Sequence, residues 1–201
     1  MDTEKTKHDQ WKNETMAKED ARSRAVRAKI KEAFLRLKKT REFYEITVSC
    51  VCREAGISRG AFYNHYANMA NLLDEILDDV FAEVTGVVEQ VSRDVERSPE
   101  KKPFCLFVRE HKEYWSIFLD DSLTTQIVDK VVRLYQKDFM KAMLPGSDLS
   151  AEQLNALFYF QFSGCFALTK KNIRLETAEW CGLQNCIDVF LRNGLEDYQF
   201  C

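Results

Sequence analysis

The residue types best suited to specific chemistry stand close together, between positions 59 and 65 of the 201-residue sequence. Arg59 can donate two hydrogen bonds to the edge of a guanine, and Asn64 can bond to an adenine or to a phosphate. Between them, the methyl group of Ala61 can touch the methyl group of a thymine. This set predicts contacts with the base edges of double-stranded DNA.

Three neighbours of these residues fit the same chemistry. Tyr63 and His65 suit phosphate oxygens, which fix the position of a protein on DNA without reading its sequence. For His65, a packed or merely exposed imidazole is an equally good interpretation. Gly60 has no side chain, so it would let the backbone approach the DNA closely.

Two short helices joined by a tight turn must position these side chains. Thr47 can cap the first helix, and Gly56 stands where a left-handed residue ends a helix at little cost. Ser58 can then cap a second helix over residues 59–66. Two helices with a turn of about three residues between them form a helix–turn–helix, whose second helix enters the major groove.

Positive charge is concentrated in the same part of the chain. Residues 1–73 hold 15 of the 29 Lys and Arg residues but only 10 of the 32 Asp and Glu residues. Arg22, Arg24, Arg27 and Lys29 crowd the start of a helix, where cations oppose the helix dipole. A phosphate backbone would account for them, and a solvated basic face is the alternative. The candidate DNA-contacting residues are Arg24, Thr47, Ser49, Ser58, Arg59, Gly60, Ala61, Tyr63, Asn64 and His65.

The helix–turn–helix has a family-like pattern. Residues 56–66, GISRGAFYNHY, follow Thr47-Val48 and precede Leu72-Leu73. This arrangement resembles the tetracycline-repressor-like (TetR) family over about residues 26–77, and the rest of the chain is similar only in layout. The resemblance implies a homodimeric repressor of an operator in double-stranded DNA, with a regulatory cavity that receives a small molecule.

Two positions depart from the family pattern. Met69 stands where the family usually has a lysine that touches phosphate, so we expect weaker affinity for the DNA backbone unless Arg22, Arg24 or Arg53 compensates. Cys52 replaces the usual alanine, which is a nearly isosteric change in a buried place.

The remainder of the chain predicts further helices, because only 7 Gly and 3 Pro interrupt the sequence. Apolar residues recur at helical spacing over 72–95, 104–119, 123–144, 150–169 and 177–191. We therefore expect an all-α fold. A three-helix helix–turn–helix domain at 21–70 would be joined by a long helix to a helical ligand-binding and dimerisation domain at 71–201. Residues 1–20 would form a mobile arm or a frayed extension of the first helix.

The helix that starts at the Ser150 capping box is apolar nearly all round from Leu154 to Leu168. Such a helix must be buried on two sides, by its own core and by a partner chain. Ser163 and Gly164 would let that partner approach closely. We expect a homodimer through the helices at about 150–169 and 177–191.

Aromatic residues of the second domain suggest a pocket for a small molecule. The candidate pocket residues are Phe81, Phe107, His111, Trp115, Phe139 and Phe158. His111 on an apolar face offers one polar group, so the ligand would be apolar or aromatic with one polar group. An aromatic stripe at helical spacing is also typical of an ordinary core, and regulation by a docked protein is a further alternative.

Nothing in the sequence has the pattern of an enzyme. The histidines His8, His65 and His111 are scattered, and no glycine-rich phosphate loop or metal-ligand spacing is present. We expect no catalysis, no metal and no cofactor.

The cysteines and the apolar runs indicate the compartment. Seven cysteines without a CxxC motif suit reduced, mostly structural thiols, although redox control stays an alternative. The most apolar run, residues 156–168, is shorter than the roughly 20 residues of a membrane span. The polar start resembles no secretory signal. We expect a cytoplasmic protein with no membrane partner.

Overall fold

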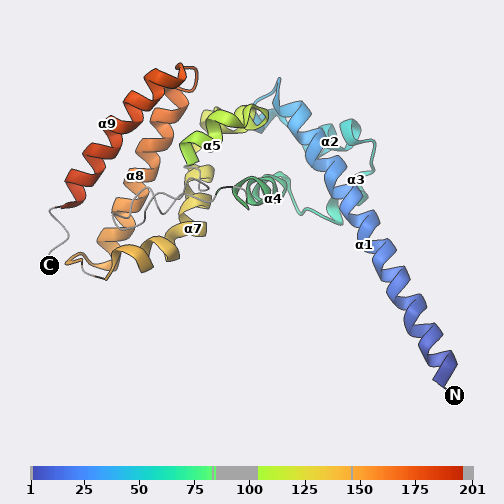
Figure 1. The fold of residues 1–201 in the computed structure, drawn as a ribbon. Coiled ribbons are helices and arrows are strands. Elements are labelled where there is room, and N and C mark those ends of the chain that lie inside the picture. Colours follow the sequence, from blue (N-terminus) through green and yellow to red (C-terminus); the bar gives the residue numbers. More distant parts are fainter. Residues whose placement is uncertain (1, 83, 85–103, 146, 197–201) are drawn as a thin grey trace. The chain divides into compact units, whose positions relative to one another are not determined.

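The computed structural model describes residues 2–82, 84, 104–145 and 147–196. Within these residues every regular element is an α-helix or a 3-10 helix (Figure 1). The all-α fold is therefore confirmed. The chain divides into two compact units, Met1–Ile76 and Leu77–Cys201, and this division falls inside a helix.

The first unit consists of a long helix followed by short ones. Its elements are α1 (Asp2–Lys38), the 3-10 helix η1 (Phe43–Glu45), α2 (Val48–Ala55), α3 (Arg59–Tyr63) and the first half of α4 (Met69–Ala82). Residues 2–20 belong to α1. The unit has its own core, in which the fully buried side chains include Ile30, Phe34, Val51, Phe62 and Leu72.

The second unit is larger and contains the remaining helices. They are α5 (Phe104–Glu110), η2 (Lys112–Tyr114), α6 (Trp115–Phe118), η3 (Asp121–Leu123), α7 (Thr124–Met143), α8 (Ala151–Lys171) and α9 (Thr177–Glu196). The long helix predicted over 72–95 is described as far as Ala82. Apart from Val84, the rest of that stretch lies outside the described residues.

The single helix predicted over 104–119 is wrong, because it breaks at His111. The indole Nε1 of Trp115 donates to the carbonyl of Val108 at 2.7 Å. In a continuous helix that carbonyl would accept from the backbone of Lys112. The regular ladder ends at the bond from His111 N to Phe107 O, and a 3-10 turn follows.

Phenylalanine rings fill the core of the second unit. The ring of Phe104 lies 5.0 to 5.7 Å from those of Phe81, Phe118, Phe162 and Phe166, measured between centroids. Burial of such rings is the largest favourable contribution to a core of this size. The capping box predicted for α8 is confirmed: Ser150 Oγ accepts from Gln153 N, and Gln153 Oε1 accepts from Ser150 N.

Polar contacts hold the second half of α4 against α7. Lys130 Nζ lies 2.7 Å from Asp78 Oδ1, although the lysine side chain is only 7% exposed. The hydroxyl of Tyr135 lies 3.0 Å from Phe81 O and 2.9 Å from Val84 O, so it caps carbonyls at the end of α4. Burial and the charge of Asp138 raise the pKa of Tyr135, which keeps the hydroxyl a donor.

Candidate nucleic-acid interface

Local side-chain caps define α2. Thr47 Oγ1 accepts a hydrogen bond from Cys50 N at 3.3 Å, which satisfies one of the free amides of the first turn. The helix ends at Gly56, whose φ of 66° and ψ of 38° are left-handed. A side chain there would be strained, so this glycine is what permits the tight turn into α3.

The short helix α3 is held by one cap and two buried rings. Ser58 Oγ accepts from Ala61 N at 3.1 Å. Phe62 and Tyr66 are almost fully buried, with ring centroids 5.6 Å apart. α3 ends at Tyr63 instead of continuing to residue 66, and the amides of His65 and Tyr66 both bond to the carbonyl of Phe62.

The opposite side of α3 is exposed and polar. Arg59, Gly60, Tyr63 and Asn64 are all exposed, whereas Ala61 and His65 are half-buried. Arg59 Nη2 donates to the Tyr63 hydroxyl at 3.5 Å, and its guanidinium lies 6.0 Å from the centre of that ring. The structure thus places a predicted base contact, Arg59, beside a predicted phosphate contact, Tyr63.

The other predicted contact residues surround this helix or precede it. Thr47 and Ser49 are exposed at the start of α2, and Ser58 is exposed at the start of α3. The hydroxyls of Thr47 and Ser58 already serve as helix caps, so each would contact DNA with its remaining hydrogen-bonding capacity. Arg24 is exposed on α1.

Two cations of α1 share one carboxylate within the unit. Lys31 Nζ lies 2.8 Å and Arg27 Nη1 lies 3.6 Å from Glu75 Oε1 of α4. Burial alone would raise the pKa of Glu75, but the two cations outweigh it and the pKa is lowered. Arg27 is therefore a structural residue as well as a possible phosphate ligand, which the sequence alone did not show.

Comparisons with known proteins agree with this geometry. Residues 30–76 match the family described as "Bacterial regulatory proteins, tetR family". The matched segment contains the core of α1, the whole helix–turn–helix and the start of α4. The chain carries a TetR-family DNA-binding domain.

Solved structures extend the likeness beyond that domain. The protein "Dihydroxyacetone kinase operon activator DhaS" is 20% identical, with a TM-score of 0.52 over 87% of this chain and 98% of its own. The TetR family repressor AlkX from Dietzia sp. strain DQ12-45-1b is 17% identical, with a TM-score of 0.46 over 83% of this chain and 95% of its own. The likeness to DhaS shows a shared fold. No curated protein matches the sequence. The chain is thus all-α and carries a TetR-type DNA-binding domain over residues 30–76.

Two residues that sequence reasoning did not select flank α2 in the TetR-type domain. Tyr44 is 74% exposed in η1, and Arg41 is exposed just before it. A cation and an aromatic residue directly ahead of a helix cap are suitable for phosphate contacts. That short basic–aromatic stretch is the signal that could have identified them.

Cys50 has an unusual environment beside Thr47 and Ser49 of the TetR-type domain. Its Sγ lies 3.3 Å from Thr47 Oγ1 and 3.6 Å from Arg41 Nη1. Hydrogen bonds from Thr47, and then the charge of Arg41, lower the pKa of this thiol. At Cys52 burial raises the pKa, although the charge of Arg59 acts the other way. Two cysteines of one helix therefore differ in acidity.

The aromatic candidates of the second unit lie in its core. Phe81, Phe107, Phe139 and Phe158 are buried. The rings of Phe139 and Phe158 stack with centroids 4.5 Å apart. The role of these residues in ligand binding stays a prediction.

His111 and Trp115 lie at the break between α5 and α6. The imidazole of His111 stacks on Phe107 at 4.1 Å, and its Nδ1 lies 2.8 Å from Glu113 Oε1. Its side chain is 30% exposed, so it is not sealed in the core. His111 is thus a partly accessible polar group beside buried rings, while the indole of Trp115 is bonded to the backbone.

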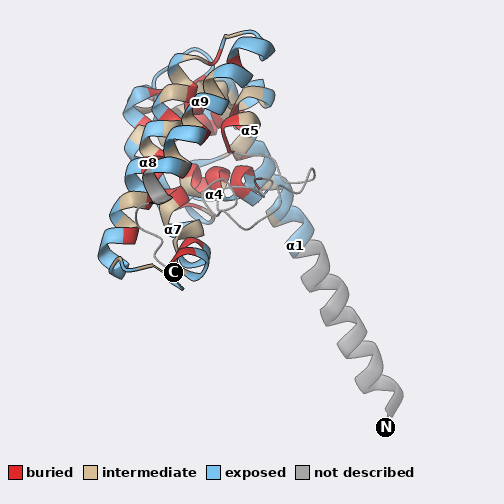
Figure 2. Ribbon diagram, turned by 60° about the vertical axis from the view of Figure 1, so that its left-hand side comes forward, coloured by how far each residue is buried: buried red, intermediate tan, exposed pale blue. Residues whose placement is uncertain are grey.

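α8 and α9 leave apolar side chains in water. Phe160 is 69% exposed and Phe190 is 70% exposed, and Val189 and Tyr159 also lie open. Figure 2 shows exposed surface along the outer sides of both helices. Gly164 belongs to this exposed side, and a Cβ built on it would meet nothing within 4 Å. The sequence predicts that α8 is buried on two sides. Within a single chain, α8 is covered on one side and exposed on the other.

Two other kinds of site are absent from the described residues. No group of three or more His, Cys, Asp or Glu side chains there could hold a metal ion. None of the described helices is both long and apolar enough to cross a membrane.

Proposed function

We propose that this TetR-type regulator is a homodimeric repressor that binds a palindromic operator through α3 and is released by a small molecule. The observation that carries the proposal is the exposed side of α3, where Arg59, Tyr63 and Asn64 stand over the buried rings of Phe62 and Tyr66. A regulator of this kind acts on chromosomal DNA, which places it in the cytoplasm.

In this proposal some residues of the first unit contact bases and others contact phosphates. Arg59 bonds to a guanine, Asn64 to an adenine or phosphate, and Ala61 touches a thymine methyl. The phosphate ligands are Arg24, Thr47, Ser49, Ser58, Tyr63 and His65. Gly60 has no side chain to hold α3 away from the groove. A Cβ added to this residue would have ordinary contact with Ser58 Oγ, at 3.7 Å.

Dimerisation through α8 and α9 covers the exposed rings of Phe160 and Phe190 and brings two copies of α3 to one operator. Two such helices read half-sites about 34 Å apart, or a multiple of this distance, because successive major grooves on one side of DNA are so spaced. The operator is proposed to be palindromic because a two-fold symmetric dimer presents the same helix to each half-site.

Release requires a ligand that favours a different spacing of the two α3 helices. We place the ligand among Phe81, Phe107, His111, Trp115, Phe139 and Phe158, with His111 as the polar contact. α7 carries Phe139 and also holds α4 through Lys130 and Tyr135. A ligand that shifts α7 therefore acts on α4, the helix that begins in the DNA-binding unit.

A ligand screen tests this proposal. Apolar and aromatic compounds with one polar group are screened by thermal shift, and each hit is tested for release of the protein from an operator fragment. We expect a hit that weakens operator binding, and operator DNA should weaken its binding by the same factor. His111→Phe should lose the response and keep operator affinity. Hits that bind without affecting the operator would contradict ligand control.

Control by cysteine chemistry is the second candidate, favoured by the environment of Cys50. Its acidified thiol lies within hydrogen-bonding distance of Thr47, a proposed DNA contact. Modification of that thiol would place bulk against the phosphate backbone.

A further inference from the structure

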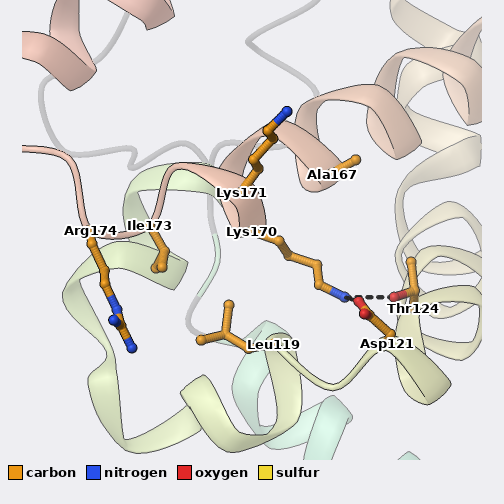
Figure 3. Close-up of a pocket in the computed structure, with 8 residues that line it drawn as sticks. All are labelled: Leu119, Asp121, Thr124, Ala167, Lys170, Lys171, Ile173 and Arg174. Atoms are coloured by element: carbon orange, nitrogen blue, oxygen red, sulfur yellow. Dashed lines mark hydrogen bonds and ion pairs between the residues drawn. The ribbon is translucent and has the colours of Figure 1, made fainter.

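A cavity of about 550 Å³ lies in the second unit, where the end of α8 and the turn after it meet the start of α7 (Figure 3). This volume is within the range of small-molecule sites. None of the six aromatic candidates lines it. The cavity is therefore a separate feature, and its interpretation does not depend on the proposed repressor mechanism.

The lining of the cavity is positively charged. Lys170, Lys171 and Arg174 contribute three cations, and Asp121 contributes a single anion. In Figure 3 the three cations point in different directions: Lys170 points towards Asp121 and Thr124, Arg174 lies on the other side of Leu119, and Lys171 points away from both. A net positive lining favours an anionic ligand.

Lys170 is held by two polar partners. Its Nζ lies 2.6 Å from Asp121 Oδ1 and 2.8 Å from Thr124 Oγ1, and its side chain is 12% exposed. The Asp121 side chain, by contrast, is 97% exposed. A largely buried ammonium thus has a counter-ion that is almost wholly in water. The anion of a ligand can replace that carboxylate, because the released Asp121 side chain is already hydrated, and the desolvation that remains is that of the ligand's own anionic group.

The rest of the lining is apolar. Leu119, Ala167 and Ile173 line the same cavity, and Ile173 is 7% exposed. Cations beside an apolar wall suit an organic anion better than a bare ion, since the apolar part of the ligand gains from burial.

We infer that this cavity binds a small organic anion, a carboxylate or phosphate ester with a short aliphatic part. The anionic group lies at the Lys170 ammonium, in place of the Asp121 carboxylate, and the aliphatic part lies against Leu119 and Ile173, on the side of the cavity where Arg174 adds its positive charge. Carboxylate and phosphate share this recognition chemistry, because both accept hydrogen bonds from ammonium and guanidinium groups.

Calorimetric titration of the full-length protein with sodium hexanoate and with monobutyl phosphate tests the inference. Hexan-1-ol and hexylamine serve as neutral and cationic controls of similar apolar size. Ionic strength is held constant, because salt screens exposed charges such as Arg174. We expect saturable binding of at least one anion and at least tenfold weaker binding of both controls.

Three variants locate the site. Arg174→Gln, at an exposed position, should weaken binding of the anion at least fivefold without affecting the fold. Asp121→Asn should strengthen it at least twofold, because it removes the competing carboxylate. Lys141→Gln should leave it unchanged, since Lys141 follows Thr124 by 17 residues of α7, about 25 Å along the helix axis.

Four results would overturn the inference. These are failure of both anions to bind, equal binding of hexan-1-ol, an unchanged affinity in Arg174→Gln, and a loss in Lys141→Gln as large as in Arg174→Gln. Circular dichroism of each variant separates a lost site from a lost fold. None of these outcomes bears on operator binding, so they leave the proposed repressor function untouched.

Discussion

The guanidinium of Arg59 lies over the ring of Tyr63, one helical turn further along α3, and its Nη2 donates to the Tyr63 hydroxyl at 3.5 Å. Both side chains are exposed. A surface arginine that already has a neighbour loses less conformational freedom when it binds. The arrangement therefore prepares Arg59 for the contact with guanine that we propose.

Replacing Arg59 by alanine tests its role in reading bases. Arg59→Ala should cost about 1–3 kcal/mol of operator binding and relax the base preference at one position of each half-site. Fluorescence anisotropy on the operator and on random DNA measures both effects. Tyr63→Phe keeps the ring and serves as a control with a smaller loss. An equal loss on operator and random DNA would show that Arg59 contacts only phosphates.

Replacing Met69 by lysine tests whether an added phosphate contact strengthens DNA binding. Met69 is half-buried at the start of α4, where we expect a lysine to reach a DNA phosphate. Met69→Lys should tighten binding to all DNA sequences alike and steepen the dependence of log K on log salt by about 0.9, the value for one added phosphate contact. Titrations at several salt concentrations give this slope. An unchanged slope would mean that residue 69 does not face the DNA backbone.

Replacing Gly164 by leucine tests the proposed dimer surface on α8. Because a Cβ there meets nothing within 4 Å in the single chain, Gly164→Leu should fold normally and yet hold a partner helix away. Sedimentation velocity should show a dimer for the unmodified protein and a monomer for the variant, with loss of operator binding. Ala151→Leu is the matched control, because Ala151 is also exposed but lies in the first turn of α8, 13 residues and about 20 Å from Gly164 along the helix axis. A stable monomer of the unmodified protein would exclude this interface.

The thiols of Cys50 and Cys52 should differ in their pH dependence. Both have an ordinary pKa of 9.0, lowered at Cys50 and raised at Cys52. Only the thiolate reacts with iodoacetamide. The rate of alkylation should therefore reach half its maximum below pH 9.0 at Cys50 and above it at Cys52, as followed by peptide mass spectrometry.

The pH at which the alkylation rate reaches half its maximum reports the pKa of the thiol, whereas the maximal rate reports how accessible the thiol is. The burial of Cys52 therefore lowers its maximal rate without affecting the comparison of pKa values. Alkylation of Cys50 should also weaken operator binding, and Cys50→Ser should be resistant to the reagent. Coincident midpoints, or alkylated protein with full affinity, would count against control through Cys50.

Structural features that depend only on neighbouring residues in the sequence were predictable. The caps at Thr47, Ser58 and Ser150, and the left-handed Gly56, depend only on neighbours up to four residues away. The side of α3 that faces solvent follows from the spacing of its aromatic residues. This local information was sufficient to place the candidate DNA-contacting residues.

Features that depend on distant partners were not predictable. The break at His111 requires the indole of Trp115 to take the carbonyl of Val108, which no periodicity reveals. The buried Lys130 is acceptable only because Asp78 lies beside it, 52 positions earlier in the chain. The cationic cavity likewise joins α7 to the end of α8. Such pairs arise only when helices pack.

The central claim, that the exposed side of α3 selects a DNA sequence, is tested most directly by selection of genomic fragments with the unmodified protein and with Gly60→Leu. The leucine side chain would stand on the exposed side of α3, where the only non-bonded atom near an added Cβ is Ser58 Oγ at 3.7 Å, so the fold should persist while the groove is blocked. We predict fragments that share an inverted repeat, enriched by the unmodified protein and lost with Gly60→Leu. Equal enrichment by the two proteins, or fragments with no shared sequence, would contradict the account.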